Sequence, residues 1–217
     1  DWVGLEAISR RALLWGAGGS AFASLAGCKV VPIAEGGASA GGFDAKTWAA
    51  DLWSSKVLPY FATQAKPLAD VLKALAGDLD EAGKQYGYRP SAEGAAWTFA
   101  VSGSATVRQK NTTSRAGTLV LAVTGADMAA PVVLQIGPVI IGSAIRDALP
   151  FVDFKDFTNQ LDFADASKAL TVLALASITP LVAKIEEGSQ IKFAGAFSMT
   201  SKSDPVRITP VTLAVQS

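Results

Sequence analysis

The chain has 217 residues, with nineteen basic and nineteen acidic side chains and therefore no formal net charge at pH 7. This balance argues against a nucleic-acid partner, because proteins that bind a phosphate backbone carry an excess of lysine and arginine. The chain also has no histidine and a single cysteine. Histidine-dependent hydrolases, histidine zinc sites and an internal disulfide are therefore excluded, and we expect neither a metal nor an organic cofactor.

Residues 1–28 have the pattern of a bacterial export signal that ends in a lipid-attachment site. Arg10 and Arg11 precede a short apolar, glycine-rich stretch that leads to Leu-Ala-Gly-Cys at 25–28. These four residues look like a lipobox, in which the thiol of Cys28 is acylated; a buried free cysteine is the alternative. We therefore expect a periplasmic, lipid-anchored protein of the bacterial cell envelope, attached to the membrane through its acyl chains.

The arginine pair also resembles a twin-arginine export motif, and both this route and the Sec route stay open. Residues 29–42 are rich in glycine and alanine and are expected to form a flexible linker. No segment after the linker is expected to span a membrane.

Residues 43–94 are expected to form a helical segment. Asp44 is placed to cap a first helix, with Phe43 and Trp48 in contact across the cap. Pro59 is expected to kink or end this helix.

A second helix is expected to begin at Pro67 and to end at Gly77. The segment 86–90, Tyr-Gly-Tyr-Arg-Pro, follows it and carries two aromatic rings and a cation. Such a segment either stacks on a sugar or base, or is a packed loop.

Residues 95–217 are expected to form a strand-rich domain. Alternation of apolar and polar residues predicts strands near 97–108, 117–123, 132–136, 191–199 and 208–215. Between the third and fourth strands, apolar positions at intervals of three and four predict a helix that Asp162 or Asp165 caps and Gly188 ends. Pro210 in the last strand indicates an edge or a bulge.

The predicted fold class is therefore α+β, with an N-terminal helical segment and a five-stranded OB-fold-like β-barrel that has a helix between strands 3 and 4. A plain antiparallel sheet with helices at one end is the alternative.

The central polar stretch, residues 132–166, holds the candidate residues for binding a ligand or a partner. They are Gln135, Arg146, Asp147, Asn159 and Gln160. The three amides either hydrogen-bond the hydroxyls of a sugar or bond neighbouring backbone. Arg146 beside Asp147 is either an anion clamp or a structural ion pair. The phenylalanines of this stretch are core residues or the wall of a pocket.

Carboxylates are also concentrated here, at Asp147, Asp153, Asp156, Asp162 and Asp165. A calcium site or an acid/base pair of a hydrolase would require such a concentration. Their spacing fits no EF-hand, so both interpretations are weaker than a structural role.

Several short segments resemble those of the predicted periplasmic lipoproteins of bacteria classed as domain of unknown function 2291. They are CKVVPI at 28–33, LWSSKVLP at 52–59, AGKQYG at 82–87, SRAGT at 114–118, QIGP at 135–138, and IRDALPF at 145–151 followed by FTNQ at 157–160. The family has no assigned reaction. The resemblance implies a role near carbohydrate uptake, because members look commonly encoded beside sugar-type ABC transporters.

Three functional hypotheses follow. The first is a non-enzymatic, membrane-tethered accessory of a sugar-type ABC uptake system that contacts a transporter component or its ligand. The second is a module that binds a small ligand, such as a sugar or polyol, on a face with Gln135, Arg146, Asn159 and Gln160. The third and weakest is a hydrolase that acts through Asp147, Asp153 and Asp156.

Overall fold

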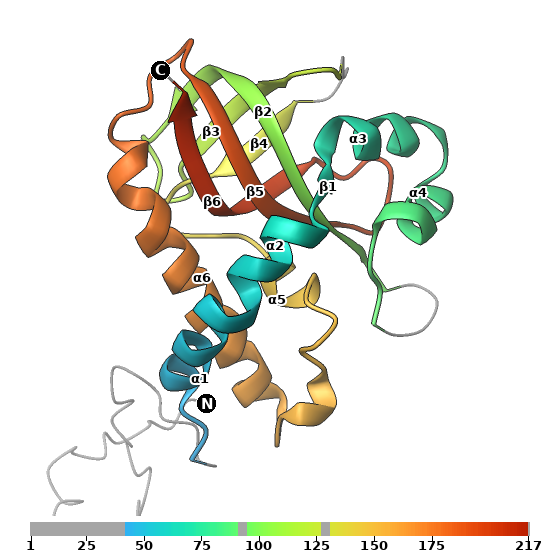
Figure 1. Ribbon diagram of the computed structural model, residues 1–217, viewed down its shortest axis with the longest axis vertical. Helices are drawn as coiled ribbons and strands as arrows, with labels where there is room; N and C mark the ends of the chain where they lie inside the picture. Colours follow the sequence, from blue (N-terminus) through green and yellow to red (C-terminus); the bar gives the residue numbers. More distant parts are fainter. Residues whose placement is uncertain (1–41, 91–94, 127–130, 217) are drawn as a thin grey trace, which may run out of the picture. The chain divides into compact units, whose positions relative to one another are not determined.

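The computed structural model describes residues 42–90, 95–126 and 131–216 (Figure 1). Their contacts place them in one compact unit, Ala38–Ser217. The predicted export signal, Cys28 and all but the last residue of the linker lie outside the described residues. The domain boundaries predicted from the sequence stay predictions.

The first helix begins where the sequence predicts. The Asp44 carboxylate accepts hydrogen bonds from the backbone N–H groups of Lys46 and Thr47, at 3.1 and 3.2 Å. A third bond, from the Thr47 hydroxyl, is the largest of the effects that hold the pKa of Asp44 below its ordinary value. The rings of Phe43 and Trp48 lie 5.9 Å apart, so the predicted contact across the cap is confirmed.

Pro59 does not end this helix, so that part of the prediction is wrong. The chain stays helical through α1 (Ala45–Leu52), the π-helical segment η1 (Trp53–Val57) and α2 (Leu58–Gln64). In η1 the N–H of Leu58 bonds the carbonyl of Trp53, five residues earlier. Proline has no N–H and clashes with the carbonyl four residues before it, and the wider π turn accommodates it at the start of α2.

The second predicted helix is confirmed as α3 (Leu68–Gly77), which follows Pro67 and buries four apolar side chains: Leu68, Val71, Leu72 and Leu75. The sequence analysis missed α4 (Leu79–Tyr86), which Asp78 caps by accepting from the N–H of Glu81. Its Gly83 packs on the ring of Trp97 so closely that a Cβ there would lie 2.2 Å from a ring carbon.

Six strands form one sheet in the spatial order β1-β2-β3-β4-β6-β5. They are β1 (Lys66–Pro67), β2 (Trp97–Asn111), β3 (Thr118–Val123), β4 (Val132–Gln135), β5 (Gln190–Met199) and β6 (Arg207–Gln216). The prediction of five strands omitted β1, since two residues are too few to show a period. β1 pairs in parallel with the middle of β2.

The five longer strands close into a ring, because β2 pairs with both β3 and β5 (Figure 1). Residues 97–106 of β2 pair antiparallel with β5, and residues 105–111 pair antiparallel with β3. β4 and β6 run parallel and join the two halves. After α4, three strands, a helical region and two strands follow one another along the chain.

The register between β5 and β6 shifts next to Gly195, which pairs with Pro210. The predicted bulge at Pro210 is thereby confirmed. A Cβ on Gly195 would lie 2.3 Å from the carbonyl oxygen of Thr209. The two strands therefore approach each other more closely here than a side chain would allow.

The long connection between β4 and β5 contains α5 (Ala144–Asp147), the 3-10 turn η2 (Phe154–Asp156) and α6 (Gln160–Val182). The sequence suggested Asp162 or Asp165 as the cap of α6, and this prediction is wrong. Asn159 caps α6, because its side-chain oxygen accepts from the N–H groups of Leu161 and Asp162.

The end of α6 also differs from the prediction. The helix runs through Pro180 and ends at Val182, and Gly188 lies in the following turn with a φ of +88°. Within the described part of the chain, α6 is long and apolar enough to cross a membrane by length and composition. One side of it is buried against the sheet and α1, through Ala166, Leu170, Ala174 and Ile178.

Two buried clusters hold these layers together. One joins α3 and α4 to the ring and includes the stacked rings of Phe99 and Phe197, whose centroids lie 5.0 Å apart. The other joins α1, α2, α5 and α6 to the outer side of β5 and β6. The second cluster fixes the connection that carries most of the candidate residues.

Replacing Gly195 by alanine is expected to lower the free energy of unfolding by about 2 kcal/mol or more, because the new methyl group collides with backbone that has no room to move. Urea denaturation of the full chain measures this change. Gly77→Ala is the matched control, since nothing lies within 4 Å of a Cβ there. Equal stability of the two variants would contradict the close approach of β5 and β6.

Candidate functional site

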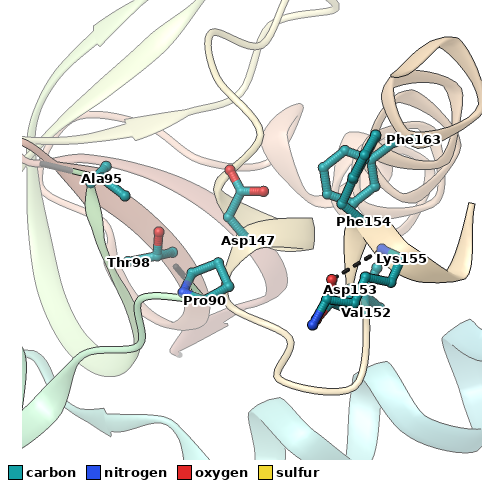
Figure 2. Close-up of a pocket in the computed structure, with 10 residues that line it drawn as sticks. Pro90, Ala95, Thr98, Asp147, Val152, Asp153, Phe154, Lys155 and Phe163 are labelled. Carbon is teal, nitrogen blue, oxygen red and sulfur yellow. Dashed lines mark hydrogen bonds and ion pairs between the residues drawn. The ribbon is translucent and has the colours of Figure 1, made fainter. Parts of the chain in front are cut away.

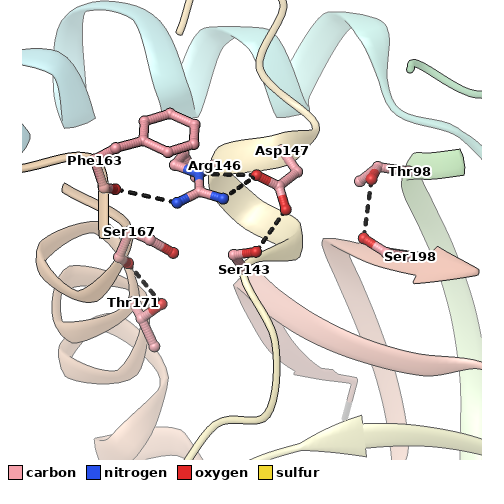
Figure 3. A network of polar contacts seen from close by, with 8 residues as sticks. All are labelled: Thr98, Ser143, Arg146, Asp147, Phe163, Ser167, Thr171 and Ser198. Atoms are coloured by element: carbon pink, nitrogen blue, oxygen red, sulfur yellow. Dashed lines mark hydrogen bonds and ion pairs between the residues drawn. The ribbon is translucent and has the colours of Figure 1, made fainter. Parts of the chain in front are cut away.

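Arg146 and Asp147 of α5 form the centre of a polar network (Figure 3). The Nε and Nη2 atoms of Arg146 both donate to Oδ1 of Asp147, at 2.8 and 2.6 Å. Oδ2 of Asp147 accepts from the Ser143 hydroxyl at 2.5 Å. Both carboxylate oxygens therefore have a donor within α5 and the residue before it, which fixes the carboxylate in one orientation.

The same guanidinium ties α5 to α6. Its Nη1 donates to the carbonyl of Phe163 at 3.1 Å, and its carbon lies 3.6 Å from the centroid of the Phe163 ring. The Arg146 side chain is 12% exposed. Of the two roles weighed for Arg146, the structure shows the ion pair with Asp147.

Asn159 and Gln160 lie at the start of α6, and their surroundings differ. The amide nitrogen of Asn159 donates to Oδ2 of Asp162 at 3.0 Å, so both ends of this side chain serve the cap. Asp162 is 1% exposed, and its Oδ1 has no hydrogen-bond partner among the described residues. Gln160 is exposed.

Gln135 is buried in β4 and holds the loop that follows it. Its amide nitrogen donates to the hydroxyl of Thr209 and to the carbonyl of Ile141, and its oxygen accepts from the N–H of Ile141. Each polar atom of the side chain is thus bonded within the protein. The structure does not bring Gln135 together with Arg146 in one network.

Asp147 faces a cavity of about 500 Å³ (Figure 2). Phe154 and Phe163 lie on one side of it, with ring centroids 5.4 Å apart, and Thr98 and Ala95 of the β2 region lie on the other. The remaining lining residues are Pro90, Ala96, Val152, Asp153 and Lys155. This volume is within the range of small-molecule sites.

The polar groups of the cavity differ in how firmly they are held. Asp153 accepts from the N–H of Lys155 at 3.0 Å, and their charged groups lie 3.9 Å apart. The Asp156 carboxylate in turn accepts from the N–H of Asp153. These carboxylates therefore stabilise the turn η2. No group of three carboxylate or cysteine side chains able to hold a metal gathers within the described ranges.

Asp147 is the member of the predicted set that lines this cavity, while Gln135, Arg146, Asn159 and Gln160 do not. The sequence analysis placed Asp153 and Phe154 in the candidate stretch but missed Thr98 and the segment around Pro90 and Ala95. No local pattern marks those residues. They reach the site because ring closure brings the start of β2 next to α5.

The aromatic and cationic segment 86–90 is divided between two environments. The guanidinium carbon of Arg89 lies 4.1 Å from the Trp97 ring centroid, and its Nη1 lies 3.6 Å from the Asp80 carboxylate. The Trp97 indole N–H donates to the same carboxylate at 2.7 Å. Arg89 is therefore packed within the protein, as expected if segment 86–90 is a packed loop. Tyr86 and Tyr88 border another, smaller cavity.

Comparison with known proteins places the chain in a family. The model of a family described as "Predicted periplasmic lipoprotein (DUF2291)" matches residues 20–214. The chain belongs to this family. The resemblance seen in the short sequence segments is thereby confirmed, and the lipoprotein is assigned to the bacterial cell envelope, on the periplasmic side and attached through lipid. The family description names no molecular function.

A solved structure supports the fold of the lipoprotein. An OB-fold protein of Thermotoga maritima superposes with a TM-score of 0.68 at 17% identity, covering 81% of this chain and 99% of that one. At this identity the likeness shows the fold alone, and it confirms the predicted OB-like architecture. A search of curated proteins found no match.

Asn159→Ala is expected to lower the free energy of unfolding by about 1–2 kcal/mol, because it leaves two N–H groups of α6 without an acceptor and removes the donor to buried Asp162. Urea denaturation measures the loss. The neighbouring change Gln160→Ala should alter stability by less than about 0.5 kcal/mol, since this side chain is exposed. A larger effect at Gln160 than at Asn159 would show that the cap is assigned to the wrong residue.

Proposed function

We propose that this periplasmic lipoprotein binds a small sugar or polyol, without turnover, in the cavity that Asp147 faces. The observation that carries the proposal is the Asp147 carboxylate, which is fixed by Arg146 and Ser143 and lines a cavity of about 500 Å³ that two phenylalanine rings also line. The remaining acceptor site on Oδ2 of an oriented carboxylate can accept a hydrogen bond from a ligand hydroxyl. An aromatic ring packs against the apolar face of a sugar ring.

The orientation of the carboxylate is the main reason to prefer binding over a structural role alone. Each carboxylate oxygen can accept two hydrogen bonds, and the donors from Arg146 and Ser143 leave capacity for a ligand on Oδ2. The Asp147 side chain is 28% exposed, so it reaches solvent in the cavity. Phe154 is 46% exposed and so presents an open aromatic surface beside it.

Hydrolysis is the less favoured alternative. A glycosidase needs one carboxylate with a raised pKa that donates a proton and a second that acts as nucleophile or base. Asp153 and Asp156 instead accept backbone hydrogen bonds within η2, so these two carboxylates already hold the turn. We therefore propose that the protein is not an enzyme.

We further propose that the bound ligand belongs to a sugar-type ABC uptake system that the lipoprotein serves. The periplasmic location of the family supports this role, because such a system collects its substrates there. A tethered domain with a sugar-sized cavity would hold ligand near the membrane. The partner within the system is a component of the transporter or its binding protein.

Thermal unfolding of the full chain with a panel of sugars and polyols tests the binding proposal. A ligand at about 100 times its dissociation constant adds roughly 2.7 kcal/mol of stability, at about 2–4 °C per kcal/mol for a chain of this size. Asp147→Asn should weaken binding about tenfold or more, because a charge-assisted hydrogen bond contributes roughly 1.5–3 kcal/mol.

Asp51→Asn is the matched control, since Asp51 is an exposed carboxylate on α1 that does not line the cavity. It should leave the response intact. A panel without any response, or equal affinities for the Asp147→Asn variant and the unaltered chain, would rule out this ligand class at this cavity.

The uptake role predicts a neighbour in the cell. A photo-crosslinking residue in place of Lys155, an exposed side chain at the cavity, should capture a transporter or binding-protein component during growth on the ligand. The same residue in place of Lys84, exposed on α4, should capture less of it. Capture at neither position, while the ligand still binds, would remove the uptake role and leave the binding proposal.

A further inference from the structure

A second cavity, of about 180 Å³, lies beside the start of β2 and is separate in chemistry from the first. We call it the tyrosine cavity. It is lined by Tyr60, Gln64, Lys66, Gln85, Tyr86, Gly87, Tyr88, Thr98 and Ala100. The chain contains three tyrosines, and all of them border this cavity: Tyr60 comes from α2, and Tyr86 and Tyr88 come from the end of α4 and the residues after it.

The fold holds these side chains from several directions. Tyr60, on α2, packs its ring edge-on against Phe61 and Phe151, with centroids 5.7 and 5.8 Å away. Tyr88 is fixed through its backbone, which exchanges two hydrogen bonds with Thr98 of β2 at 2.8 and 2.9 Å. The Tyr60 ring and the Tyr88 backbone therefore have defined positions without a ligand, as a binding site requires.

Charge distinguishes this cavity from the one that Asp147 faces. Among the described residues that line it, Lys66 is charged and none is acidic. Lys66 belongs to β1, and its pairing with Val101 of β2 holds the backbone at the rim. An exposed ammonium group without a lining carboxylate favours an anionic ligand.

The uncharged polar groups of the tyrosine cavity can hydrogen-bond the hydroxyls of a ligand. The hydroxyl of Tyr86 accepts from the amide of Gln85 at 3.1 Å, which leaves its own proton free to be donated. Burial, and secondly the proximity of Tyr88, raises the pKa of Tyr60, so this hydroxyl keeps its proton at neutral pH. Helices α2 and α4 both end here, and carbonyl groups at helix ends lack partners within the helix.

We infer that the tyrosine cavity is a second binding site, for a hydroxylated carboxylate of monosaccharide size such as a sugar acid. The carboxylate pairs with Lys66 and a tyrosine hydroxyl, the ring packs on tyrosine faces, and the ligand hydroxyls bond the amides and helix-end carbonyls. The site does not require the first cavity to be occupied.

The tyrosines themselves provide the measurement. In the full chain with isotope-labelled tyrosine, D-glucuronate should shift the tyrosine ring resonances in a saturable way, while D-glucose at the same concentration should not. All three tyrosines report on this cavity, so the signal has no contribution from tyrosines elsewhere. Absence of a saturable shift with D-glucuronate would overturn the inference.

Substitutions of two lysines test whether the charge of Lys66 binds the ligand carboxylate. Lys66→Met should weaken the D-glucuronate response roughly fivefold or more, since it removes the ion pair and its hydrogen bonds. Lys73→Met, at an exposed lysine of α3, is the matched control and should leave the response unchanged. Equal responses of the two variants would overturn the role of Lys66.

Asp147→Asn separates this site from the proposed sugar cavity. It should leave the tyrosine response to D-glucuronate intact even where it abolishes the response to a neutral sugar. Loss of the D-glucuronate response in Asp147→Asn, with Lys66→Met unaffected, would place the anion in the other cavity and overturn the second site.

Discussion

The pairing of β2 with both β5 and β3 is the constraint on which the rest of the structure depends. The first part of this strand bonds β5 and the last part bonds β3, so a single strand closes the ring. Closure then requires β4 and β6 to lie side by side in parallel. β4 and β5 follow one another along the chain but have β6 between them in the sheet, so no tight turn can join them, and the long connection through α5 and α6 links them instead.

This connection carries the candidate chemistry, and one side chain holds it together. Arg146 donates to Asp147 within α5 and to the carbonyl of Phe163 in α6, while its guanidinium lies on the Phe163 ring. A planar group with several fixed donors makes these contacts at once, which a lysine could not do. The Asp147 carboxylate therefore has a defined direction at the wall of a cavity, whereas an aspartate on an open surface would be mobile.

Thr98, near the start of β2, borders both cavities. One combines carboxylates with phenylalanine rings, and the other combines a lysine with tyrosine hydroxyls. These different polar groups favour different ligands.

The sequence by itself determined the elements whose signals are local. Alternation along β2, β3, β5 and β6 gave the strands, and Asp44 and Pro67 gave the starts of two helices, because a cap and a period are properties of neighbouring residues. The lipoprotein family was also readable, since its short segments need no fold to be compared.

Only the tertiary structure decided which polar side chains bond one another and which residues line the cavities, because these partners are distant along the chain. The capping of α6 by Asn159, with Asp162 buried, reverses the sequence expectation because packing against α1 selects the helix start among several equivalent polar residues. Gln135 proved to bond Thr209, 74 residues away, and Thr98 proved to border two cavities. A sequence pattern specifies which face of a strand is apolar, but ring closure decides which side chains meet across it.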